Sequence, residues 1–365
     1  MISQRNLQCS FAFIPYGAVV APEPGRVFLD VGNRLSPGVI DHHQPGAEEE
    51  CATSLVRHYP HYVLGHLAGL APPDVTLVTH IAPDLDAVTA GYFCHSLIVA
   101  GRLPRHADLI ANYVKEIDQG ICFRHPGEVV TVYGVFTAIC ELIKSGNPRP
   151  GQIDGGLDLQ RVLQGFAIWD YVLEAMAPGA DLHRNGMFQR PHPFEAAEDL
   201  IVMDHAKYLD DLAAAAKQRF SLPLHSGGGR GWVDALLAVN PASLLFRSWA
   251  RGDNRHAPGG RGFCLLAVNY DFKRYIISVD PQSPYTLKGL GDLLEAAETE
   301  KRRRLGAERV GDPRPGYASP DPWYDGRNPL HNFTIVDTPR GGTVLTWEEI
   351  LAILSEYGAN VRAAP

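Results

Sequence analysis

Short apolar runs in the first part of the chain predict strands. They cover residues 8–20, 26–30, 38–40 and 75–80. The last run, VTLVTH, is almost continuously apolar, which is typical of a parallel strand covered by helices on both faces. Apolar residues at helical spacing follow in residues 51–69, interrupted by Pro60, and in residues 87–101. This alternation predicts an α/β domain built on a parallel sheet with helices on both faces.

A long helical pattern, EAAEDLIVMDHAKYLDDLAAAAKQRF, divides the chain. We predict a first domain over residues 1–195, a helical connector over residues 196–219 and a smaller α+β domain over residues 220–365. The last region has strand-like runs such as FCLLAVNY, and a basic helix whose end, KRRR, we expect to be a solvent-exposed face. Thr346 and Glu349 predict a capping box at the start of the final helix.

The composition is that of a soluble globular protein. Of 365 residues, 45% are hydrophobic and 20% charged, which suits one large or two medium domains. The formal net charge of -8 argues against long nucleic-acid duplexes as partners, since such surfaces are usually basic. No uninterrupted apolar run is long enough for a membrane span. The six cysteines form no CxxC pair and predict reduced, buried thiols in a cytoplasmic protein.

Acidic and imidazole side chains follow the predicted strands. Asp30 ends one apolar run, and Asp41, His42 and His43 follow the next. The carboxyl ends of parallel strands meet at one edge of a sheet, where α/β proteins place their sites. We therefore expect these side chains to lie close together and to form metal-ligand loops.

A second cluster, HIAPDLDA, follows the strand at residues 75–80 and contains His80, Asp84 and Asp86. Pro83 biases Ala82 toward an extended shape, and an extended loop would point the two aspartates in the same direction. Converging carboxylates repel each other unless a cation lies between them. We therefore predict two divalent cations about 3.5–4 Å apart. Carboxylate and imidazole ligands favour Mn²⁺, with Mg²⁺ or Co²⁺ as alternatives.

Four motifs together carry a family resemblance. HIAPDLDA, VFLDVGNR, IDHHQP and DQGICFRHP, which begins at Asp118, resemble the motifs of the DHH phosphoesterase family. The family normally begins with the His-x-x-Pro-Asp motif, whereas here that motif follows Asp-His-His. The order looks like a permuted connection of the same sheet, because the ends of a domain often lie close together.

The resemblance implies a ligand set for two cations. His80 and Asp84 would bind one of them, and Asp86, His42 and Asp118 would bind the other. Dinuclear sites of this kind activate a hydroxide for in-line attack on phosphorus.

The resemblance also implies roles for three further residues. Asp30 would bridge the cations, and His43 would be the catalytic residue that faces the substrate. Asp41 would orient an imidazole or the loop through hydrogen bonds.

A substrate-binding C-terminal domain with a glycine-rich loop is a further implication of the resemblance. The closest local pattern is GGRG at residues 259–262, which contains Arg261; Arg247 precedes it. A glycine turn and a guanidinium suit a phosphate group. A plain turn with solvated arginines is an equally weighted alternative.

The leading hypothesis is a manganese-dependent phosphodiesterase acting on a short oligonucleotide, a dinucleotide or a cyclic dinucleotide. An inorganic pyrophosphatase or polyphosphatase is the second enzymatic hypothesis, and it would require basic residues crowded near the metals. A non-catalytic nucleotide-binding sensor module is the third. The expected partner is a small phosphorylated or nucleotide substrate, with no membrane, and a homodimer is left open.

Overall fold

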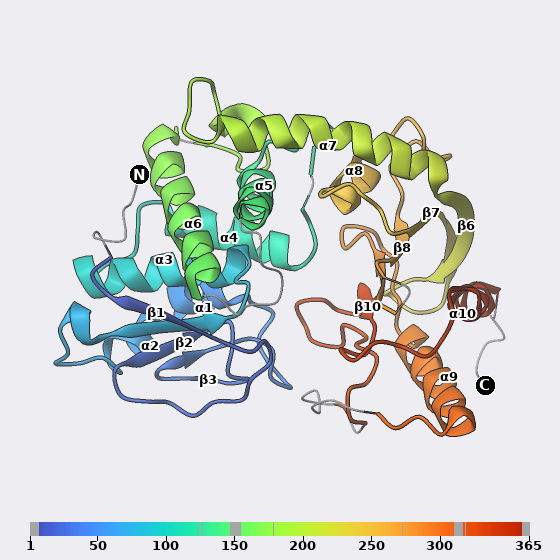
Figure 1. Ribbon diagram of the computed structural model, residues 1–365, viewed down its shortest axis with the longest axis horizontal. Helices are drawn as coiled ribbons and strands as arrows, with labels where there is room; N and C mark the ends of the chain where they lie inside the picture. Colours follow the sequence, from blue (N-terminus) through green and yellow to red (C-terminus); the bar gives the residue numbers. More distant parts are fainter. Residues whose placement is uncertain are drawn as a thin grey trace. The chain divides into compact units, whose positions relative to one another are not determined.

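The computed structural model describes residues 7–122, 124–125, 127–146, 155–177, 179–271, 273–309, 317 and 319–359. The chain divides into two compact units (Figure 1). The first consists of Met1–Cys122 with Glu128–Ile201, and the second of Phe123–Gly127 with Val202–Pro365. Within the described ranges, no helix combines the length and the apolar character that crossing a membrane requires.

The first unit is built on a mixed sheet in the order β1-β5-β2-β4-β3. Its strands are β1 (Ser10–Ile14), β2 (Arg26–Leu29), β3 (Leu35–Ser36), β4 (Val39–Ile40) and β5 (Thr76–His80). β5 pairs in parallel with β1 and β2, and β2 pairs in parallel with β4, as the apolar runs predict. β3 pairs antiparallel with β4, so the prediction of a purely parallel sheet is wrong at this edge. The reason is a tight turn at Gly38, whose φ of 81° folds the chain back.

Helices follow the strands in the predicted alternation. They are α1 (Ala52–His58), α2 (Pro60–Leu64), α3 (Leu85–Ala100), α4 (Ala107–Asp118), α5 (Val132–Ser145) and α6 (Gly155–Ala175), with short 3₁₀ turns at Pro72–Asp74 and Asn185–Met187. Pro60 separates α1 from α2, as predicted. α3 packs against β5 and β2, and α6 packs against β1.

Helices α3 and α6 also pack against each other. The indole of Trp169 on α6 donates a hydrogen bond to Thr89 Oγ1 on α3 at 2.8 Å. A Cβ at Gly165 would approach the side chain of Val88 to 2.3 Å, so glycine is required for this close contact. The first two turns of α3 therefore lie beside the middle and the C-terminal half of α6.

The second unit has a mixed sheet in the order β10-β9-β8-β7-β6. Its strands are β6 (Ala216–Pro223), β7 (Arg230–Val239), β8 (Leu265–Asn269), β9 (Tyr275–Val279) and β10 (Ile335–Asp337). Its helices are α8 (Phe246–Gly252), α9 (Leu290–Leu305) and α10 (Trp347–Ala359), and the unit boundary falls within α7 (Glu195–Ala214). The predicted connector helix over residues 196–219 extends too far, because β6 begins at Ala216 and pairs along its whole length with β7.

Two local predictions in the second unit have different outcomes. The capping box of α10 is confirmed, since Thr346 N donates to Glu349 Oε2 at 2.7 Å and Glu349 N donates to Thr346 Oγ1 at 3.3 Å. The expectation of a fully solvated KRRR face is wrong for Lys301 and Arg302. Their side chains are 18% and 15% exposed and pair with Glu349 and Glu298.

The six cysteines, all within the described residues, are free thiols. Cys9, Cys51 and Cys94 are buried, and the other three are half-buried. The free thiols agree with the prediction of reduced cysteines. The prediction that these cysteines are buried holds for three of the six.

Candidate metal centre

The carboxyl ends of three neighbouring parallel strands supply most of the site. Asp30 follows β2, the segment Asp41-His42-His43 follows β4, and His80 is the last residue of β5. Because β4, β2 and β5 are adjacent and parallel, these ends lie at one edge of the sheet. The first turn of α3 and the end of α4 complete the cluster with Asp84, Asp86 and Asp118.

Asp30 lies at the centre of the cluster and is 3% exposed. Its Oδ1 is 3.0 Å from His42 Nε2, and its Oδ2 is 3.3 Å from His80 Nε2. Its backbone adopts a left-handed φ of 58°, which is uncommon for a non-glycine residue and is one of the strained conformations that cluster at functional sites. Each carboxylate oxygen of Asp30 thus faces a different imidazole.

The remaining ligands form two groups around Asp30. Within each group the candidate ligand atoms lie within 4.8 Å of one another. The groups are Asp30 with His80 and Asp84, and His42 with Asp86 and Asp118. Asp30 also belongs to a third overlapping group, with Asp41, His42 and His43. The structure therefore brings together every candidate ligand that the sequence of the first unit predicts.

The distances between ligand atoms fit a bound cation. Ligand atoms around an octahedral ion with bonds of about 2.1 Å lie about 3.0 to 4.2 Å apart. His42 Nε2 lies 3.5 Å from Asp118 Oδ2 and 3.9 Å from Asp86 Oδ2, and His80 Nε2 lies 4.0 Å from Asp84 Oδ1. In addition, Asp118 Oδ2 is buried and has no hydrogen-bond partner among the described residues. A buried carboxylate oxygen without a hydrogen-bond donor fits a role as a metal ligand.

Asp84 and Asp86 do not point in the same direction, so the extended-loop interpretation is wrong. Asp84 is the N-cap of α3 and accepts a hydrogen bond from Ala87 N at 3.0 Å. Asp86 lies inside the first helical turn. The rotation of the helix between the two positions directs one carboxylate to the His80 group and the other to the His42 group.

Ala82 also departs from its predicted extended shape. Its φ is 56°, in the left-handed region, in spite of Pro83. A hydrogen bond from Ala82 N to Asp158 Oδ1 at 3.0 Å holds this conformation. Asp158 lies on α6, is 6% exposed and was not predicted, because nothing local to it indicates a contact with a loop about 76 residues earlier.

Asp86 has a second role that the sequence did not indicate. Its Oδ2 accepts a hydrogen bond from Ala52 N at 2.7 Å, and its Oδ1 accepts one from Thr53 N at 2.8 Å. It thereby caps the N-terminus of α1, where Cys51 provides no side-chain cap. The carboxylate is therefore fixed in position before any cation binds.

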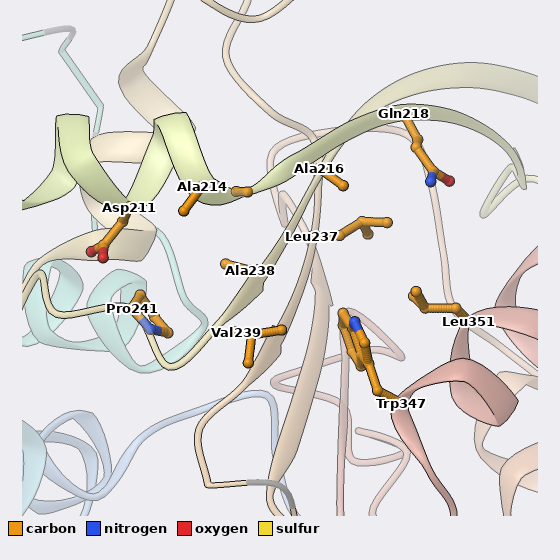
Figure 2. A pocket seen from close by; sticks show the side chains of 11 residues that line it. Asp211, Ala214, Ala216, Gln218, Leu237, Ala238, Val239, Pro241, Trp347 and Leu351 are labelled. Carbon is orange, nitrogen blue, oxygen red and sulfur yellow. The ribbon is translucent and has the colours of Figure 1, made fainter.

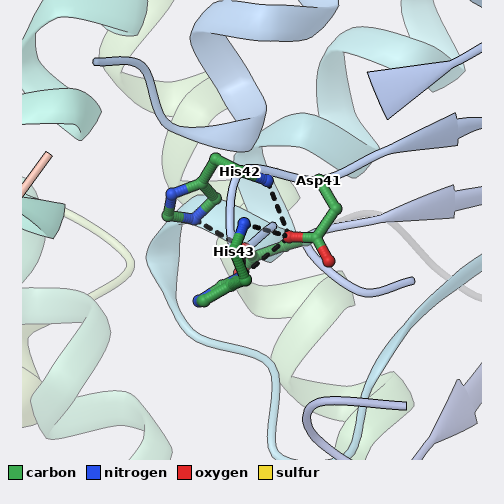
Figure 3. Close-up of side chains that lie close together, drawn as sticks. Asp41, His42 and His43 are labelled. Atoms are coloured by element: carbon green, nitrogen blue, oxygen red, sulfur yellow. Dashed lines mark hydrogen bonds and ion pairs between the residues drawn. The ribbon is translucent and has the colours of Figure 1, made fainter. Parts of the chain in front are cut away.

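Asp41 supports the loop that carries the two histidines (Figure 3). Its Oδ1 accepts hydrogen bonds from His42 N at 2.7 Å, from His43 N at 3.2 Å and from His43 Nδ1 at 2.7 Å. Its Oδ2 accepts one from Asn33 N at 2.6 Å. The side chain of His43 is 25% exposed, and its Nε2 lies 2.9 Å from the hydroxyl of Tyr16, a neighbour that the sequence did not predict.

Burial and mutual contact set the charges of the cluster. Burial would raise the pKa of Asp30, but hydrogen bonds from His42 and His80 hold that pKa well below its usual range. Burial lowers the pKa of His80, but its hydrogen bond with Asp30 and the negative charges of Asp84 and Asp30 together outweigh burial and raise the pKa to about 10. Burial raises the pKa of Asp86 to about 6 and that of Asp118 well above its usual value. Without a cation, the imidazoles of the cluster therefore do not balance the negative charge of all its buried carboxylates.

Arg247 and Arg261 belong to the second unit and are exposed. A cavity of about 300 Å³ in that unit (Figure 2) is walled mainly by apolar side chains such as Leu237, Val239 and Trp347. Neither arginine lines this cavity. Neither lines a second cavity of about 810 Å³, whose walls include Lys273 and Trp347. Substrate binding by these two arginines stays a prediction.

Residues 123 and 126 of the fourth motif lie outside the described part of the chain.

No protein-family model, curated protein or solved structure significantly matches the chain.

Proposed function

We propose that this protein is a metal-dependent phosphoesterase of the DHH type with permuted motif order. It would hydrolyse a phosphodiester of a short oligonucleotide, a dinucleotide or a cyclic dinucleotide. The observation that carries the proposal is the convergence of two groups of carboxylate and imidazole side chains on Asp30 from four separate segments. Buried carboxylates that converge without a cation destabilise a fold, so such an arrangement favours a metal-binding role.

The donor set fits two divalent cations, and we propose Mn²⁺, with Mg²⁺ or Co²⁺ as substitutes. When bound, the cations would lower the pKa of a coordinated water and neutralise charge on the phosphoryl oxygens. Asp30 would lie between them. The residues that would hold them are His80 with Asp84, and His42 with Asp86 and Asp118.

His43 is the residue best placed to contact the substrate. Unlike His42, it is partly exposed, and Asp41 fixes its Nδ1 so that Nε2 points away from the protein's own carboxylates. The hydroxyl of Tyr16 lies at hydrogen-bond distance from this nitrogen. A phosphoryl or leaving-group oxygen in the place of that hydroxyl would receive a proton or a hydrogen bond from His43.

The KRRR run of α9 gives no support to a pyrophosphate substrate. In the KRRR run, Lys301 pairs with Glu349, Arg302 with Glu298 and Arg303 with Glu300. These cations are engaged by carboxylates of their own unit. A site for pyrophosphate would need such cations to be available to the substrate.

The test is hydrolysis by the purified protein with Mn²⁺, using bis(p-nitrophenyl) phosphate, a dinucleotide, a cyclic dinucleotide and pyrophosphate. We expect cleavage of a diester that EDTA abolishes and added Mn²⁺ restores. His43→Ala should lower the rate by about 10²- to 10⁴-fold, because it removes a positioned proton donor. His58→Ala, at an exposed position at the end of α1, is the matched control and should leave the rate unchanged.

Two outcomes would contradict the proposal. An unchanged rate in His43→Ala would remove the assigned role of that residue. Absence of hydrolysis, together with a higher melting temperature in the presence of nucleotides, would favour the non-catalytic binding module instead.

A further inference from the structure

The end of β1 brings a tyrosine to the same edge of the sheet as the metal ligands. β1 lies beside β5 and is parallel to it, and Tyr16 follows β1 by two residues. The hydroxyl of Tyr16 lies 2.9 Å from His43 Nε2. Its ring is T-shaped against the rings of His43 and His80, with centroids 5.5 and 5.2 Å away. Tyr16 thus contacts the residue assigned to the substrate and one ligand of the His80 group.

The loop that carries Tyr16 is tied to the carboxylate that supports the histidine loop. The side-chain amide of Asn33 donates hydrogen bonds to the carbonyl oxygens of the two residues after Tyr16, at 3.1 and 3.3 Å. The backbone N–H of Asn33 donates to Asp41 Oδ2 at 2.6 Å, and the other oxygen of Asp41 orients His43. One connected set of hydrogen bonds therefore positions Tyr16 and His43, as expected of two groups that act on the same atom.

Tyr16 lies on the exposed side of the cluster. It is 50% exposed, and the side chain of His43 is 25% exposed, whereas Asp30 and His42 are buried. Under the proposed function, the substrate oxygen that His43 binds takes the place of the tyrosine hydroxyl. A half-exposed ring has room to shift toward solvent. The hydroxyl then stays at hydrogen-bond distance, about 2.8 Å, from that substrate oxygen.

We propose that Tyr16 is a catalytic residue whose hydroxyl donates a hydrogen bond to the leaving-group oxygen of the substrate. The inference rests on the proposed function and assigns a second group, beside His43, to that oxygen. When the P–O bond breaks, its electron pair passes to the leaving oxygen, while the oxygen of a deprotonated water forms the new bond to phosphorus. The leaving oxygen takes its proton from His43, and Tyr16 keeps its own. The hydrogen bond from Tyr16 stabilises the negative charge that develops on the leaving oxygen.

The size of this effect depends on the leaving group. An alkoxide, such as the 3′-oxygen of a nucleoside, carries a localised negative charge and is strongly stabilised by a donor. A p-nitrophenolate spreads its charge over the ring and depends little on a donor. A residue that only maintains the structure would affect both reactions equally.

The test compares the dinucleotide TpT with the p-nitrophenyl ester of thymidine 5′-phosphate, both with Mn²⁺ present. The two substrates share the thymidine 5′-phosphoryl group and differ in the leaving group. Tyr16→Phe keeps the ring and removes the hydroxyl. It should lower kcat for TpT by about 10- to 100-fold, the effect of losing a hydrogen bond to a charged group, and leave kcat for the ester unchanged. Tyr62→Phe, on α2 and outside the groups of candidate ligands, is the matched control and should leave both rates unchanged.

Each outcome decides the inference. A loss of kcat confined to TpT supports it. An equal loss with both substrates, a change in KM alone or unchanged kinetics overturns the inference, while cleavage by the wild-type protein still upholds the proposed function. Cleavage of the ester alone by the wild-type protein also overturns the inference, because no alkoxide is then assisted. If the wild-type protein cleaves neither substrate, the proposed function fails and the inference fails with it.

Discussion

The carboxylate of Asp41 can be tested with a substitution that changes a single atom. Asp41 is 1% exposed, and its two oxygens accept hydrogen bonds from Asn33 N and from donors of His42 and His43. Asp41→Asn keeps the size of the side chain and replaces one oxygen with an NH₂ group. The amide oxygen can take over the bonds to the histidines. The NH₂ group then faces the N–H of Asn33, so that two donors meet in a buried place.

The expected cost follows from that mismatch. A buried donor left without an acceptor costs about 2 kcal/mol. For a unit of this size, such a loss lowers the melting temperature by about 4–8 °C. The variant also removes the negative charge that orients His43, so we expect a 10- to 100-fold lower hydrolysis rate.

The assay is thermal unfolding of the metal-free protein, followed by rate measurements with Mn²⁺. Asp74→Asn, at an exposed position in a 3₁₀ turn, is the matched control and should leave both quantities unchanged. A melting temperature and a rate equal to those of the wild-type protein would refute the assignment of Asp41 as the support of the histidine loop.

Two further variants test other parts of the structure. Asp158→Leu removes the acceptor of Ala82 N and should weaken Mn²⁺ binding about tenfold. Asp158→Asn keeps an acceptor and should bind Mn²⁺ normally. Equal Mn²⁺ affinities of the two variants in calorimetry would contradict this prediction. Tyr208→Phe removes the hydroxyl that donates to Asp253 Oδ2 at 2.6 Å and should cost about 1.5–3 kcal/mol at pH 7. Burial would raise the pKa of Asp253, but its bonds with Tyr208 and His256 lower it. The stabilisation from these bonds is complete above the unfolded-state pKa of Asp253, near 3.9, and is lost as the pH falls through its lower folded-state pKa. The loss of unfolding free energy in Tyr208→Phe, measured by urea unfolding, should therefore shrink toward pH 3. An equal loss at pH 7 and pH 3 would contradict this prediction.

The convergence of the site could be predicted because it depends on local patterns. Each apolar run identifies a strand, and each polar residue after it lies at the same edge when the strands are parallel. Asp30, His42 and His80 come together for that reason. The helix break at Pro60 and the capping box at Thr346 were predictable on the same grounds, since each depends on a few neighbouring residues.

The remaining features depend on contacts between distant segments. Asp86 caps α1 through Ala52 and Thr53, and this contact is not visible in the composition of either segment. Asp158 holds Ala82 in a left-handed conformation that the following proline would disfavour. Tertiary hydrogen bonds override the local preference at both places, and spacing along the chain does not reveal them.

The central claim is that two cations bind on either side of Asp30. Anomalous diffraction at the manganese absorption edge, from crystals grown with Mn²⁺, tests it most directly. We expect two peaks about 3.5–4 Å apart, one on the His80 side of Asp30 and one on the His42 side. A single peak, or none within bonding distance of the Asp30 carboxylate, would contradict it.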